Sequence, residues 1–178
     1  MKRVLPIAVF AALAAFAALV LAAALPGQDF TYVGAQKCAM CHKSEAQGRQ
    51  FTIWESSPHA KSYQALTSPK AAEAAKSMNV SKPAEDPQCL KCHAPLFEKA
   101  PDLKAEGVTC EVCHGPGSGY RKLNIMKDRD LAVKNGLILY ANQDAIKAQC
   151  LKCHENAHGI KFDFDACWAK IKHPVPSK

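Results

Sequence analysis

The sequence predicts a mainly α-helical fold in which short helices alternate with long loops, with little or no β-sheet. Large aromatic residues are scarce, with 7 Phe and 4 Tyr in 178 residues. Long alternations of β-branched and polar residues, which indicate half-buried strands, are absent from the sequence. Cysteine clusters recur along the chain instead. A fold with so few large core residues needs another source of buried apolar surface.

The N-terminal segment predicts export. Two positive charges in Met1–Arg3 precede an uncharged apolar run over Val4–Leu25, and three alanines stand just before Leu25. This pattern is typical of a secretory signal peptide. The run is also long enough to span a bilayer, so an uncleaved membrane anchor is the alternative. We expect a signal peptide over 1–24 and a single domain over 25–178, located in the periplasm or outside the cell of a Gram-negative bacterium.

The charge of the chain argues against a nucleic-acid partner. The formal net charge is +7, and removal of Lys2 and Arg3 with the signal peptide lowers it to +5. The remaining excess is small and scattered, whereas nucleic-acid binding needs a concentrated basic surface. A membrane partner is expected only if the N-terminal segment stays uncleaved.

Eight of the nine cysteines fall into four C-x-x-C pairs, and a histidine follows every pair. The four motifs are Cys38-Ala-Met-Cys41-His42, Cys89-Leu-Lys-Cys92-His93, Cys110-Glu-Val-Cys113-His114 and Cys150-Leu-Lys-Cys153-His154. Nine cysteines in an exported chain would first suggest disulfides. C-x-x-C-H, however, is the attachment motif of c-type haem. Two thiols form thioethers with one porphyrin, and the adjacent imidazole binds its iron.

Zinc is the alternative ligand for C-x-x-C pairs, but zinc sites do not require a histidine after each pair. We therefore expect four covalently bound haem c groups. Their proximal iron ligands are expected to be the motif histidines, His42, His93, His114 and His154. The short helices and long loops should wrap around these four haems, which supply the missing apolar surface. Because haem burial is then part of folding, the haem-free chain should not fold stably.

Three histidines remain as sixth ligands for four irons: His59, His158 and His173. At most three haems can therefore have two histidines from this chain. The fourth iron is then open, takes methionine or another ligand, or borrows a histidine from a neighbouring molecule. Met126, in a loop after the third motif, is the methionine candidate, and a packed apolar residue is its alternative interpretation.

The surroundings of the spare histidines predict where they lie. Ser57 and Pro58 are typical of a helix start, which would place His59, Tyr63 and Leu66 on one helix face. Asn156 and Gly159 favour a turn around His158.

A second helix is expected to begin at Asp163 or Asp165 and run to about Lys172, with His173 after it and Pro174 ending it. Cys167, the odd cysteine, would lie within this helix as a buried free thiol.

The sequence resembles the tetrahaem cytochrome c-554 family over residues 32–173. The resemblance depends on W-x-x-S-x-H-A-K in "WESSPHAKSYQAL", on "GVTCEVCHGPGSGY", and on a late Phe-rich helix ending in histidine. It implies a mostly helical electron-transfer protein with haems in stacked and perpendicular pairs. It also implies that His59 and His173 are distal ligands.

The resemblance implies further that the haem of His93 is five-coordinate, as in the best-known member. A distal histidine follows the G-P-G turn in that family, but this sequence has none between Gly115 and Ala148. The haem of His42 would then use Met126 or His158. Related tetrahaem proteins build extracellular filaments in which a neighbouring subunit completes a haem.

We expect an electron carrier between a redox protein donor and a redox protein acceptor. An enzyme is not the main expectation, because no dedicated catalytic motif such as C-x-x-C-K is present. One alternative is a redox enzyme acting on a nitrogen oxide at an open haem, and another is a self-assembling haem filament. Five basic residues are candidates for a partner-binding face, with an ordinary solvated surface as the alternative: Lys104, Arg121, Lys122, Lys127 and Arg129.

Overall fold

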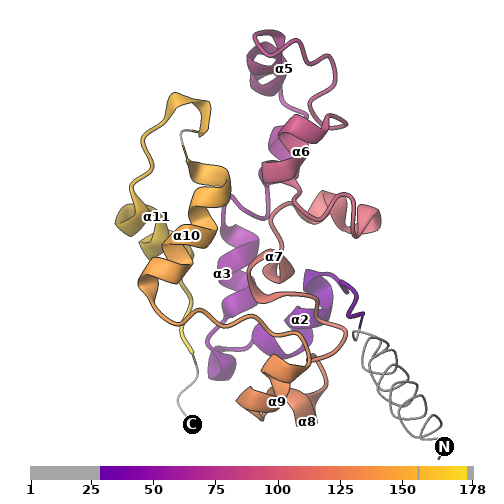
Figure 1. The fold of residues 1–178 in the computed structure, drawn as a ribbon, viewed down its shortest axis with the longest axis vertical. Helices are drawn as coiled ribbons and strands as arrows, with labels where there is room; N and C mark the ends of the chain where they lie inside the picture. The colour runs from indigo at the N-terminus through magenta and orange to yellow at the C-terminus, as the bar shows by residue number, and fades with distance from the viewer. Residues whose placement is uncertain (1–28, 156, 176–178) are drawn as a thin grey trace, which may run out of the picture.

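The computed structural model describes residues 29–155 and 157–175, and these residues form only helices, turns and loops (Figure 1). The prediction of a mainly α-helical fold is confirmed, since no strand occurs in the described part of the chain. The predicted signal peptide at 1–24 lies outside the described residues. Among the helices that are described, none is long and apolar enough to cross a membrane.

The described helices are short, and the longest of them has 12 residues. The α-helices are α2 (Ala35–His42), α3 (Gln50–Ser56), α4 (Ser62–Ala65), α5 (Pro69–Lys76), α6 (Pro87–His93), α7 (Cys110–His114), α8 (Leu123–Met126), α9 (Arg129–Lys134), α10 (Gln143–His154) and α11 (Phe164–Ile171). Single 3-10 turns are η1 (Glu45–Gln47) and η3 (Ala157–Gly159), and η2 (Pro101–Glu106) is a longer one. Along the long axis of the molecule, α5 and α6 lie at one end, α8 and α9 lie at the other, and α3 and α7 lie between them (Figure 1).

Each of the four C-x-x-C-H motifs ends a helix, and in α7 the motif is the whole helix. Helices α2, α6, α7 and α10 all end at the histidine of their motif. Residues three and four apart are neighbours on a helix surface. The first cysteine of each motif therefore shares a helix face with the second cysteine and with the histidine. The common local structure presents two thiols and one imidazole on the same side.

Side-chain caps fix where several of these helices begin. The Asp86 carboxylate accepts the Gln88 N–H before α6, and the Asn142 side chain accepts the Ala145 N–H before α10. The Asp163 carboxylate accepts the Ala166 N–H at 3.0 Å, which confirms the predicted start of α11. Each such cap contributes about 1 kcal/mol to the stability of its helix.

The predicted helix start at Ser57 and Pro58 is wrong. Ser57 has extended backbone and ends α3, and its hydroxyl donates to the Trp54 carbonyl at 2.7 Å. Residues 58–61 form turns, and α4 begins only at Ser62. Pro58 explains the end of α3, because a proline disfavours helical backbone in the residue before it. Beyond it, the His59 carbonyl accepts the N–H groups of Ser62 and Val108, and a turn forms in place of the predicted helix start.

The side-chain core is small. One buried cluster joins Leu66, Leu90 and Ala94, with the Tyr63 and Phe97 rings packed against it. Large apolar side chains elsewhere remain exposed, among them Met40 at 78% and Ile160 at 68%. The chain thus leaves uncovered apolar surface next to its cysteine motifs, which suits a fold completed by large apolar cofactors.

Candidate haem-binding sites

The structure brings six of the seven histidines together in three pairs. The ring centroids are 6.1 Å apart for His59 and His154, 6.1 Å apart for His93 and His158, and 5.8 Å apart for His114 and His173. Each pair joins one motif histidine to one histidine outside the motifs. Two metal–nitrogen bonds of about 2 Å, plus about 1 Å from each nitrogen to its ring centre, place two imidazoles on one metal about 6 Å apart. The spacing of all three pairs fits one iron between the rings.

Burial favours the neutral form of four of the six paired imidazoles. It is the largest cause that lowers the pKa of His114 to about 4, followed by the charges of His173 and His42. Burial also lowers the pKa values of His59, His154 and His173. Neutral imidazole is the metal-binding form of histidine, so these environments suit iron ligands.

A strap of residues 57–66 carries His59 toward His154. The Val108 N–H donates to the His59 carbonyl at 3.0 Å, and the Trp54 indole N–H donates to the Val108 carbonyl at 2.8 Å. Gly107 has φ of 67°, and a Cβ there would lie 2.6 Å from the His59 carbonyl oxygen. Only glycine allows both the backbone angle and this close approach. The W-x-x-S-x-H-A-K and G-V motifs thus form one structural unit.

The same strap orients His93. Its ring Nδ1 lies 2.9 Å from the Ser62 carbonyl oxygen, which can only accept a hydrogen bond. Nδ1 must therefore carry the proton, and Nε2 is left as the metal-binding nitrogen. The Ser62 hydroxyl lies 2.8 Å from the carbonyl oxygens of both His59 and His93, and it accepts the Val108 N–H at 3.1 Å.

His158 reaches His93 from a strained turn after α10. Its backbone is left-handed, with φ of 55° and ψ of 26°, and Gly159 follows with φ of 69°. The Ile160 N–H closes this turn by donating to the Ala157 carbonyl at 3.0 Å. The turn predicted from Gly159 is confirmed, and it directs His158 away from the helix of His154 and toward the ring of His93.

His42 differs from the other motif histidines. All seven histidines lie in the described part of the chain, and His42 is in none of the three ring pairs. Its Nδ1 is buried without a hydrogen-bond partner among the described residues. Met126 ends α8 and is half-buried.

The cysteine motifs are close neighbours in space. The Glu111 carboxylate of α7 accepts the Gly34 N–H at the start of α2 at 2.8 Å. The Cys153 thiol of α10 donates to the Lys91 carbonyl of α6 at 4.0 Å. Burial is the largest cause that raises the pKa of Cys153 to about 12. The Gln149 amide donates to the Val112 carbonyl at 3.2 Å, which joins α10 to α7. The motif helices therefore follow one another in space in the order α2, α7, α10, α6.

Sequence reasoning missed Glu111, which lies inside the third motif. Its carboxylate is 1% exposed and accepts backbone N–H groups of Val33 at 3.0 Å, Gly34 at 2.8 Å and Gly117 at 2.6 Å. It thereby attaches α7 to the N-terminal end of α2. The available signal was an acidic residue between the two cysteines, where the other three motifs have only apolar residues or lysine.

Aromatic residues of the C-terminal segment pack against His154 and against one another. The Phe162 ring stacks on His154 with centroids 4.6 Å apart and an interplanar angle of 17°. Phe164 stacks on Trp168 along α11. Cys167, in the same helix, is only half-buried, so the expectation of full burial is wrong.

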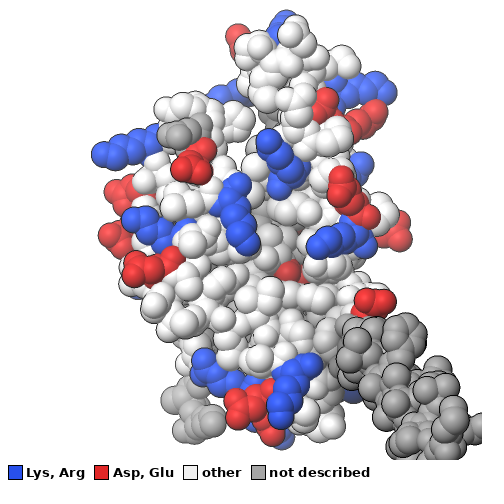
Figure 2. All heavy atoms as spheres, in the orientation of Figure 1, with Lys and Arg blue, Asp and Glu red and all other residues white. Residues whose placement is uncertain are grey.

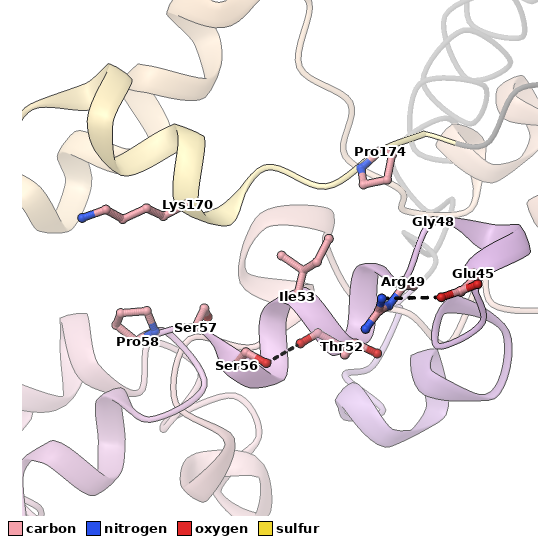
Figure 3. Close-up of a pocket in the computed structure, with 10 residues that line it drawn as sticks. All are labelled: Glu45, Gly48, Arg49, Thr52, Ile53, Ser56, Ser57, Pro58, Lys170 and Pro174. Atoms are coloured by element: carbon pink, nitrogen blue, oxygen red, sulfur yellow. Dashed lines mark hydrogen bonds and ion pairs between the residues drawn. The ribbon is translucent and has the colours of Figure 1, made fainter.

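A cavity of about 770 Å³ separates α3 from the C-terminal segment (Figure 3). Ile53 and Arg49 lie on one side of it, and Lys170 and Pro174 lie on the other (Figure 3). Its wall includes Pro58, which precedes His59, and Pro174, which follows His173. The cavity thus lies beside the segments that carry two of the non-motif histidines.

The five candidate residues of the basic face are mostly exposed. Arg121, Lys122, Lys127 and Arg129 are exposed, whereas Lys104 is half-buried with its ammonium 5.3 Å from the centre of the Tyr63 ring. Figure 2 shows basic and acidic side chains interspersed on the face in view. The partner-binding role of this set stays a prediction.

Helical C-x-x-C-H motifs, with three of the four histidines facing a second imidazole across the space of one metal, define a c-type cytochrome, a protein with covalently bound haem c. The family model described as cytochrome c554 and c-prime matches residues 37–115. Cytochrome c-554 of Nitrosomonas europaea is 31% identical over 149 residues, which cover 74% of this chain and 60% of that relative. Both matches support the cytochrome c-554 family for this chain.

The chain spans about 60% of the length of the relative that it matches. No solved structure matches the chain.

Proposed function

We propose that this chain is a tetrahaem cytochrome that transfers electrons between redox protein partners outside the cytoplasm. The three histidine pairs carry this proposal, because their spacing of 5.8–6.1 Å suits axial ligation of one iron each. When bound, each haem c supplies an iron that alternates between the ferric and ferrous states. The assignment to the cytochrome c-554 family supports the same conclusion.

Eight cysteines would attach the four haems, in pairs from Cys38 and Cys41, Cys89 and Cys92, Cys110 and Cys113, and Cys150 and Cys153. His42, His93, His114 and His154 would bind the irons on the proximal side. His59, His173 and His158 would bind the irons of His154, His114 and His93, respectively, on the distal side. Met126 is the remaining distal candidate.

The close contacts between motifs support relay of electrons through the molecule. The Glu111 carboxylate in the third motif accepts the Gly34 N–H beside the first motif, and the Cys153 thiol donates to the Lys91 carbonyl in the second, so the attachment sites form two adjoining pairs. The Gln149 amide connects these pairs through the Val112 carbonyl. The order α2, α7, α10, α6 gives every site a near neighbour.

Export is part of the proposal, because haem c attachment to this chain is expected outside the cytoplasm. The charged start and the apolar run over Val4–Leu25 support a signal peptide at 1–24 or an uncleaved anchor. The mature tetrahaem domain would be 25–178. The redox partners would dock through small transient interfaces.

Mass spectrometry of the purified, exported holoprotein tests the haem count. The expected result is four covalently bound haems per chain that undergo reversible reduction in a redox titration. Cys150→Ser combined with Cys153→Ser should lower the count to three, whereas the matched control Cys167→Ser should keep four. A wild-type chain with fewer than four haems contradicts the proposal.

A further inference from the structure

We propose that the iron held by His42 is the one with an open sixth coordination position. His158 would take the sixth position of the iron held by His93, and no histidine then remains for the iron of His42. The inference rests on the proposed function, since it assumes four haems. It reverses the assignment that the family resemblance implies, in which the iron of His93 is five-coordinate.

The first support is the geometry of His93 and His158. Their ring centroids are 6.1 Å apart, the same separation as for His59 and His154. Their interplanar angle of 68° is compatible with ligation, because two axial imidazoles rotate independently about their bonds to one metal. The Ser62 carbonyl holds Nδ1 of His93, so Nε2 is the nitrogen that remains for iron. On both sides of the site, the arrangement suits a bis-histidine centre.

The second support is the conformation of His158. A left-handed backbone is unfavourable for a non-glycine residue and persists where other interactions enforce it. The turn is exposed, and a Cβ at Gly159 would meet no atom within 4 Å. Packing around this turn is therefore sparse. A bond between His158 and iron supplies the interaction that holds the strained residue in place.

The third support is the count of histidines around His42. Every histidine of the chain is described, and the three pairs use all six of the others. His114 and His173 face each other, and the other two pairs join His59 to His154 and His93 to His158. The chain therefore has no histidine to complete the iron of His42.

Carbon monoxide binding to the reduced holoprotein tests the inference, after the haem count has been established as four. We expect one carbon monoxide per wild-type chain and two per chain for His158→Ala. The control Lys161→Ala changes an exposed residue of the same loop and should keep one.

Crystals of the carbon monoxide complex identify the iron that binds it. The wild type should carry the ligand on the iron of His42, and His158→Ala should carry a second ligand on the iron of His93. Ligand on the iron of His93 in the wild type overturns the inference but leaves the proposed function intact. Absence of uptake by the wild type also overturns it, whether Met126 or a neighbouring molecule fills the position. Fewer than four haems contradicts the proposed function itself.

Discussion

The sites of His93 and His42 share one sequence motif and one local structure, but they have different surroundings. Both histidines end a helix that presents two cysteines on the same face. The His93 ring is held at Nδ1 by the Ser62 carbonyl and faces His158, whereas the buried Nδ1 of His42 has no partner among the described residues. Groups around a metal ligand tune its basicity and the metal potential. The comparison teaches that equal motifs form equal helix ends, while distant segments determine what each motif histidine faces.

Removal of the haems should unfold both sites and should reduce the stability of the chain more than any substitution below. The chain has a small side-chain core, so most of its stabilising apolar burial must come from the haems. A chain expressed without haem maturation should show no cooperative unfolding transition, and its far-ultraviolet circular dichroism should indicate loss of most helices. A cooperative transition in the haem-free chain would show that the side chains alone specify the fold.

Glu111→Ala should damage the His42 site more than the His93 site. The buried carboxylate accepts N–H groups of Val33, Gly34 and Gly117 next to α2. Removing it leaves these donors unsatisfied, and the expected loss is on the order of 3 kcal/mol in the free energy of unfolding.

Denaturant unfolding followed by haem absorbance measures this loss. Glu111→Gln should lose less, because its amide oxygen still accepts hydrogen bonds. The control Glu85→Ala removes an exposed ion pair with Lys82 and should cost less than about 1 kcal/mol. Equal losses for Glu111→Ala and Glu85→Ala would contradict the role of Glu111.

Gly107→Ala should displace the strap from the sites of His93 and His154. A Cβ at Gly107 would lie 2.6 Å from the His59 carbonyl oxygen. Moving that backbone withdraws His59 from His154, so one low-spin haem should become high-spin in the electron paramagnetic resonance spectrum.

Gly159→Ala is the matched control, because its φ of 69° resembles that of Gly107 while its Cβ would meet no atom within 4 Å. Both variants carry backbone strain, but only the first carries the steric clash. If Gly159→Ala converted the haem of His154 from low-spin to high-spin as Gly107→Ala does, backbone strain rather than the clash with the strap would explain the result.

Ser62→Ala should have the smallest effect of these changes. It removes the hydroxyl that lies 2.8 Å from the His59 and His93 carbonyl oxygens, at an expected cost of about 1 kcal/mol. The backbone carbonyl that orients His93 remains, so the haem spectrum should not change. Ser77→Ala, which removes a hydroxyl bonded within its own helix region, serves as the control for stability. A spin-state change in Ser62→Ala would assign the orienting role to the hydroxyl.

The sequence predicted the helical class and the Asp163 cap, because each depends on residues close together in the chain. It failed at Ser57 and Pro58, where the same residues that often begin a helix instead end one. It also left open which histidine faces which motif, since that depends on contacts between segments such as Ser62 with His93. Glu111 was missed for the same reason: its partners Val33 and Gly34 are more than 70 residues away.

The number of bis-histidine haems tests the central claim most directly. Near-infrared magnetic circular dichroism of the fully oxidised holoprotein counts low-spin haems by their axial ligands. The histidine pairs predict three bis-histidine haems in the wild type and two in each of the variants His59→Ala, His158→Ala and His173→Ala. Four bis-histidine haems in the monomeric wild type, or a variant that keeps all three, would contradict the pairing.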